Sequence, residues 1–101
     1  DEETLPEVVL RADGSYLIDG LLPVDEFKEL FNLDELPDEE KIGFQTVGGF
    51  VMDQIGDIPA AGEHFEFENL RVEVVDMDGR RVDKILVSPL PGGSDAADST
   101  E

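Results

Sequence analysis

The chain has 101 residues, of which 40% are hydrophobic, and its 26 acidic and seven basic residues give it a formal net charge of −19. This length predicts one domain with a small core, and the absence of cysteine excludes disulfides, thiol catalysis and cysteine-ligated metals. A charge this negative argues against partners rich in phosphate, namely nucleic acid and anionic lipid surfaces.

A β-hairpin is expected at the start of the domain. Asp13-Gly14 lies between two runs of alternating residues, 8–12 and 15–19, and this arrangement is a strong hairpin signal. Asp19-Gly20 then ends the second strand. These signals depend only on neighbouring residues, so they predict local structure directly.

An amphipathic helix is expected after the hairpin. Pro23 suits a first helical position, because its fixed φ fits there and its missing N–H would have no partner. Apolar residues then recur at helical spacing and predict a helix from Val24 to Asn32. The segment from Asp34 to Lys41 is dominated by charge and interrupted by Pro37, so we expect a loop there.

A second helix is expected from Thr46 to Ile55, with Thr46 as its N-cap and Gly56 in the left-handed region at its C-terminus. Its buried stripe should consist of Val47, Phe50, Val51 and Ile55. Gly48 and Gly49 interrupt this helix, although each glycine costs about 1 kcal/mol relative to alanine. We therefore expect these glycines to let the helix lie close against a sheet.

The second half of the chain is rich in strand patterns. Strands are expected at 64–67, 70–76 and 80–87, with a turn at Met77-Asp78-Gly79 between the last two. Together the elements predict an α+β fold, a mostly antiparallel sheet with two helices packed on one face. The last strand is expected to leave an exposed edge that could pair with another chain.

Five motifs follow one another along the chain. They are DGSYLIDGLLPVDEFKELF at 13–31, FQTVGGFV at 44–51, IPAAGE at 58–63, LRVEV at 70–74, and DGRRV followed by ILV within 78–87. In this order they resemble the transporter-associated domain at the C-terminus of CorC/HlyC-type proteins, which are CBS-pair proteins named after magnesium/cobalt efflux and haemolysins. The resemblance covers residues 8–88 and implies a fold similar to the small lobe of FAD-linked oxidases (PCMH-like).

Composition and the resemblance together suggest an organisation of the whole chain. Residues 1–7 would be an acidic linker from an upstream domain, and residues 89–101 a disordered acidic tail. The partners would be the CBS pair and the membrane domains of a parent protein on the cytoplasmic side of the cell membrane, with a homodimer as an alternative. Phe44 or Phe65 could face such a partner. No apolar run reaches the roughly 18 residues of a membrane-spanning helix, so no direct membrane insertion is expected.

The function that the resemblance implies is a non-catalytic regulatory or interaction module that modulates divalent cation transport, of Mg²⁺ or Co²⁺. Two alternatives stay open: a small-molecule-binding domain for flavin (FAD) or an adenine nucleotide, and a haemolysin-like membrane activity. The haemolysin alternative lacks a membrane-active segment, and the net charge opposes it.

Two groups of carboxylates are candidates for weak binding of Mg²⁺, Ca²⁺ or Co²⁺, because hard cations take oxygen ligands. The first group is Asp34, Glu35, Asp38, Glu39 and Glu40, and the second is Asp76 and Asp78. The second group superficially resembles an EF-hand loop. Arg80 and Arg81 stand where that loop would need further ligands.

No catalytic residue is expected. His64 is the one histidine, and nothing near it in the sequence suggests a nucleophile with a base and an orienting group. A flavin or nucleotide site would need a glycine-rich phosphate cradle. Gly48-Gly49 lies inside a helix pattern and Gly92-Gly93 lies in the tail, so FAD binding by this chain is not expected.

Overall fold

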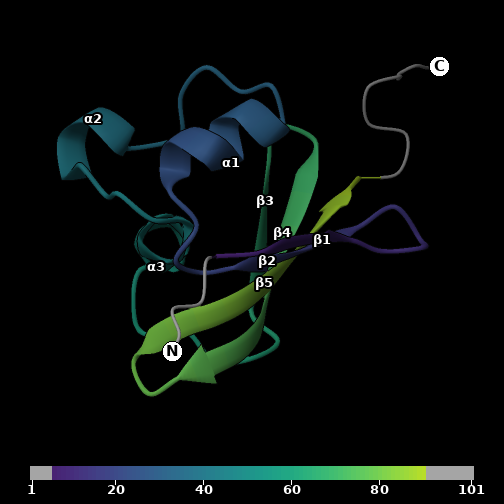
Figure 1. Cartoon of the computed structure of the whole chain (residues 1–101). Coiled ribbons are helices and arrows are strands. Elements are labelled where there is room, and N and C mark those ends of the chain that lie inside the picture. The colour runs from purple at the N-terminus through teal and green to yellow at the C-terminus, as the bar shows by residue number, and fades with distance from the viewer. Residues whose placement is uncertain (1–5, 91–101) are drawn as a thin grey trace, which may run out of the picture.

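The computed structural model describes residues 6–90, which form an antiparallel five-stranded sheet in the order β1-β2-β5-β4-β3 (Figure 1). The strands are β1 (Val8–Leu10), β2 (Tyr16–Asp19), β3 (His64–Phe67), β4 (Leu70–Asp78) and β5 (Arg81–Pro89), and the helices are α1 (Val24–Leu30), α2 (Glu39–Ile42) and α3 (Val47–Ile55). The predicted α+β class and antiparallel sheet are confirmed. The predicted linker and tail fall largely on 1–5 and 91–101, outside the described residues.

The first hairpin is confirmed, with a three-residue loop. Gly14 N donates to Arg11 O (3.0 Å), and Arg11 N donates to Ser15 O (2.8 Å). The strand therefore ends at Leu10 rather than at Ala12, because Arg11 already begins the turn. Asp13 accepts hydrogen bonds from the Ser15 hydroxyl (2.6 Å) and the Ser15 N–H (2.9 Å), and these bonds lower the pKa of its carboxyl. Gly14 takes the positive φ that this kind of loop requires.

The helix after the hairpin is shorter than predicted. Pro23 precedes α1 with an extended ψ of 142°, so the prediction of a first helical position for it is wrong. The reason is tertiary: Pro23 forms a β-bridge with Thr46, and Val24 N donates to Gln45 O. The helix ends at Leu30 because Asn32 turns to a φ of +58°.

The charged loop contains a short helix that the sequence did not predict. Glu39 lies at the first position of α2 and accepts hydrogen bonds from Lys28 Nζ of α1 (2.7 Å) and from Leu36 N (3.0 Å). Leu36 is buried in the core. The helix of four residues is therefore fixed by tertiary contacts, which residue propensities do not contain.

Loss of the Glu39 contacts should destabilise the domain in a pH-dependent way. The Lys28 hydrogen bond lowers the pKa of Glu39, so its stabilisation is present above the ordinary carboxyl pKa and is lost as the pH falls through the lowered value. Glu39→Gln should lower Tm at pH 7 by more than at pH 3. Asp25→Asn is the control, because Asp25 lies 3.8 Å from Lys28 and is 91% exposed. Equal losses at both pH values would contradict this assignment.

The junction between β2 and α3 is closely packed. Gly48 N donates to Gly20 O (2.8 Å), and Gly20 N donates to Asp83 O (2.8 Å). A Cβ on Gly48 would lie 3.0 Å from Gly20 O, and one on Gly20 would lie 2.0 Å from Val82 O. The prediction that the two glycines let the helix lie close against the sheet is therefore confirmed for Gly48 and wrong for Gly49, which faces Phe44 instead. Gly20 is part of the same contact as Gly48.

The core lies between the helices and one face of the sheet, with Phe50 of α3 at its centre. The ring of Phe50 packs against those of four other phenylalanines, at centroid distances of 5.2 to 6.2 Å. These are Phe27, Phe44, Phe65 and Phe67. Phe44 and Phe65, expected to be available to a partner, are half-buried in this cluster. In the stripe of α3, Val47, Phe50 and Val51 are buried, whereas Ile55 is only half-buried.

The last strand is not at an edge of the sheet, so that prediction is wrong. Strand β5 pairs with β2 on one side and with β4 on the other. Both long strands also extend past their predicted ends: β4 reaches Asp78 and β5 reaches Pro89, after which Leu90 N donates to Asn69 O. The outer strands among the described residues are β1 and β3.

Candidate functional site

The acidic segment around α2 contains one hydrogen-bonded carboxylate, Glu39, and one pair of neighbouring carboxylates, Glu35 and Glu40. Glu39 is held by Lys28 and Leu36, so it is not free to bind a cation without losing those bonds. Glu35 and Glu40 lie close together, and hydrogen bonding to Glu40 and its charge raise the pKa of the Glu35 carboxyl. Such a pair favours either a shared proton or a bound cation. Asp34 and Asp38 are exposed beside it.

In the second acidic candidate, one aspartate is paired with an arginine and the other lies opposite a lysine in the sheet. Asp78 accepts a hydrogen bond from Arg81 (3.0 Å), and Asp76 lies opposite Lys84 in the β4–β5 ladder. These two aspartates belong to an irregular part of the ladder next to the turn. Within residues 6–90, no three histidine or acidic side chains converge on a position that could hold a metal ion.

His64 is exposed at the start of β3, where its ladder partner is Glu73. Glu73 itself is bound by Arg71 (2.7 Å). Ser15 is buried, and its hydroxyl donates to Asp13. The two hydrogen bonds each join residues two positions apart in the sequence. Neither these bonds nor the ladder pair places Ser15 beside His64, as a serine nucleophile with a histidine base would require.

The start of α3 offers little to a phosphate group. Val47 N donates to Leu22 O (2.9 Å), Gly48 N to Gly20 O (2.8 Å), and Gly49 N to the Thr46 hydroxyl oxygen (3.2 Å). Thr46 is thus the N-cap that the sequence predicted. Because these N–H groups are already paired within the domain, they are not available for the anion binding that helix N-termini otherwise support.

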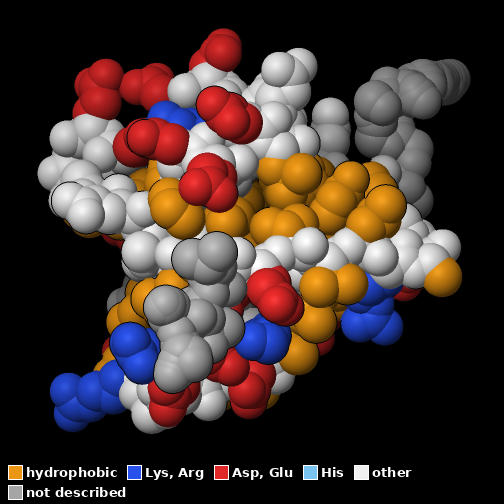
Figure 2. All heavy atoms as spheres, viewed as in Figure 1, with side chains coloured by type: hydrophobic (Ala, Val, Ile, Leu, Met, Phe, Trp, Pro, Cys, Tyr) orange, Lys and Arg blue, Asp and Glu red, His pale blue; other side chains and the backbone are white. Residues whose placement is uncertain are grey.

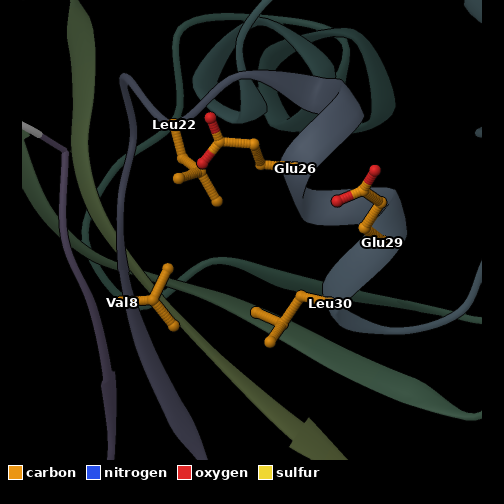
Figure 3. Close-up of a pocket in the computed structure, with 5 residues that line it drawn as sticks. All are labelled: Val8, Leu22, Glu26, Glu29 and Leu30. Atoms are coloured by element: carbon orange, nitrogen blue, oxygen red, sulfur yellow. The ribbon is translucent and has the colours of Figure 1, made fainter.

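A shallow, open groove lies between β1 and α1, with a volume of about 560 Å³ (Figure 3). The apolar walls are provided by Val8 of β1, by Leu22, which precedes α1, and by Leu30 of α1. Glu26 and Glu29 line the groove from the helix. Figure 2 shows a band of hydrophobic side chains between α1 and β1, with acidic side chains gathered over the helices above it. We name this surface the β1–α1 groove.

Sequence reasoning missed this groove, because its two walls are distant from each other along the chain. Val8 and Leu30 are each 38% exposed, and Leu10 on the same strand is 62% exposed. Leu30 is one of the apolar residues at helical spacing in α1. In the structure only Val24 and Phe27 of this helix are buried, so Leu30 is left on the surface. No helix among the described residues has the length and apolar character needed to cross a membrane.

Comparison with known proteins places this fold in a defined group. The family model described as the transporter associated domain, CorC_HlyC, matches residues 10–91. The UPF0053 protein sll0260 of Synechocystis sp. is 54% identical over 94 residues, covering 93% of this chain and 21% of that protein. The polyamine export protein of Escherichia coli K12 is 35% identical over 82 residues, covering 81% of this chain and 18% of that protein.

A magnesium and cobalt efflux protein CorC, from Pasteurella multocida, is 30% identical and covers 87% of this chain and 28% of that protein. The chain thus spans a minor part of each of these three relatives.

Solved structures agree with the sequence relatives. The transporter associated domain of a Xylella fastidiosa hemolysin, in complex with Mg²⁺ and Mn²⁺, has a TM-score of 0.71 and 38% identity, covering 82% of this chain and 96% of that one. The transporter associated domain from Nitrosomonas europaea has a TM-score of 0.72 and 31% identity, covering 87% and 99%. Both of those chains are thus little longer than the fold described above.

Proposed function

Because this chain belongs to the transporter associated domain family of CorC/HlyC-type proteins, we propose that it is a non-catalytic regulatory module of a longer cation-transport protein. The main support is the share of its relatives that this chain covers. It spans 18% of the length of a protein named for polyamine export and 28% of the length of a protein named for magnesium and cobalt efflux. The partners in this proposal are the CBS pair and membrane domains of the longer protein, on the cytoplasmic side of the membrane.

The module would respond to cations through its acidic surface. A net charge of −19 on 101 residues destabilises the compact state by self-repulsion, and bound cations relieve that repulsion. Among the described acidic residues, Glu35 and Glu40 form a pair in which hydrogen bonding to Glu40, and then its charge, raises the pKa of the Glu35 carboxyl. They are our proposed site of weak Mg²⁺, Ca²⁺ or Co²⁺ association, with Asp34 and Asp38 contributing to the local field. The 38% identical domain was solved in complex with Mg²⁺ and Mn²⁺, which supports the association of divalent cations with a domain of this family.

The proposed cation site predicts a specific effect of Glu35→Gln. The raised pKa means that the folded domain prefers the protonated pair, so stability falls as the pH rises through that pKa. Glu35→Gln should therefore raise Tm at pH 7, raise it less at pH 4, and reduce the further rise caused by Mg²⁺. Thermal unfolding at fixed ionic strength, with and without Mg²⁺, measures both effects.

Glu66→Gln is the matched control for that experiment, because Glu66 is an exposed glutamate on β3 and the same charge is removed. If both variants lose the Mg²⁺ response equally, cations act on the net charge alone and the Glu35–Glu40 site is wrong. If Mg²⁺, Ca²⁺ and Co²⁺ leave the Tm of the unaltered chain unchanged, the proposal of a cation-responsive module fails.

A further inference from the structure

We propose that the β1–α1 groove binds an aliphatic polyammonium ion, with its methylene chain on the apolar walls and its ammonium groups beside Glu26 and Glu29. The proposal rests on the cation-responsive role given above and names a second cation class at a different surface. The volume of the groove, about 560 Å³, lies within the range of small-molecule sites. Two features of the groove support this occupant.

The first feature is the apolar character of the walls. Val8 and Leu30 face each other across the groove, and Leu22 lies next to Glu26 (Figure 3). A hydrated metal ion gains nothing from such a surface, since Mg²⁺ dehydrates reluctantly and takes oxygen ligands. A chain of methylene groups, in contrast, removes apolar surface from water when it lies on these side chains. The walls therefore favour an organic cation.

The second feature is the charge on the helix side. Glu26 and Glu29 are three residues apart on α1, so their side chains are neighbours on the helix surface. Within residues 6–90 neither carboxylate has an ion-pair partner; the single lysine of α1, Lys28, is taken by Glu39 and Asp25. Two adjacent uncompensated carboxylates attract an ammonium group, and they repel every anionic ligand.

An NMR titration of the 101-residue chain tests the proposal, with spermidine, 1,4-diaminobutane and Mg²⁺ as probes at constant ionic strength. Spermidine should shift the amide and methyl signals of Val8, Leu22 and Leu30 in a saturable way, and Mg²⁺ should leave the methyl signals unchanged. The double variant Glu26→Gln/Glu29→Gln should weaken spermidine binding by about tenfold or more, because two charge-assisted contacts are lost. Leu30→Gln should weaken spermidine binding without affecting the Mg²⁺ response.

The control is the double variant Glu63→Gln/Glu66→Gln, which removes the same charge from residues outside the groove. Equal weakening in both double variants would overturn the proposal, since it would show a response to net charge alone. A concentration-dependent dimer that the substitution Leu30→Gln dissociates would also overturn the proposal, because a second copy of the chain would then occupy the groove. The Mg²⁺ effect on Glu35→Gln is measured independently, so this site can fail while the cation-responsive role stands.

Discussion

Phe50→Ala should destabilise the domain by about 3–5 kcal/mol, the usual cost of removing a fully buried phenylalanine. Phe50 is 0% exposed, and its ring contacts four other aromatic rings contributed by α1, by β3 and by the segment before α3. Deleting this ring leaves a cavity in the core between the helices and the sheet. A domain of this size has about 5–15 kcal/mol of stability in total, so the variant should be close to unfolding at 37 °C.

Urea unfolding of Phe50→Ala against Phe44→Ala measures this effect with a matched control. Phe44 belongs to the same cluster, but it is half-buried and has fewer aromatic neighbours. We expect its replacement to cost about half as much, because less apolar surface leaves water at that position. Equal costs for the two variants would mean that Phe50 is not the centre of the core.

Gly20→Ala should be destabilising by about 3 kcal/mol, at the upper end of the usual cost of overpacking. The added Cβ would lie 2.0 Å from Val82 O, a backbone atom that can move only if β5 moves. Gly20 N also donates to Asp83 O and Gly20 O accepts from Gly48 N, so any displacement loosens two hydrogen bonds. The glycine is required here for close approach and not for an unusual φ.

Gly49→Ala is the control for that substitution, because it adds the same methyl group close to the same junction. Its Cβ would lie 3.2 Å from the Cβ of Phe44, which is tight, and the higher helix propensity of alanine offsets that contact by about 1 kcal/mol. We expect a stability within about 1 kcal/mol of the unaltered chain. Thermal unfolding followed by circular dichroism compares the two, and a Gly20→Ala variant as stable as Gly49→Ala would contradict the close contact.

Elements with local signals could be predicted from the sequence. The hairpin follows from Asp13-Gly14, where glycine takes the positive φ and the aspartate bonds the next residue. The limits of α3 follow from Thr46, whose side chain caps the helix, and from Gly56, whose φ of +91° ends it. In each case the residues that determine the structure are within four positions of one another.

Elements fixed by distant contacts could not be predicted in the same way. The α2 helix depends on a hydrogen bond between Glu39 and Lys28, and the start of α1 depends on the pairing of Pro23 with Thr46. Strand β5 lies in the middle of the sheet because β2, whose residues lie 65 to 71 positions earlier in the sequence, pairs with it. Sequence patterns indicate that a strand exists, but they do not indicate its neighbours.

The candidate sites also depend on contacts between residues that are distant in the sequence. Acidic residues are so numerous that their clustering in the sequence did not distinguish Glu39, which is bound to Lys28, from Glu35, which is crowded by Glu40. The β1–α1 groove was not predicted at all, because Val8 and Glu26 meet only in the folded chain. Burial and charge in three dimensions were needed to separate these cases.

In our proposal, this domain regulates cation transport by the longer protein. The most direct test is the transport of labelled spermidine and of Mg²⁺ by that protein in vesicles, with and without residues 8–90. Our account predicts that the protein without this module still transports, but that its rate no longer depends on the cation concentration on the module's side of the membrane. The same cation dependence with and without residues 8–90 would contradict it.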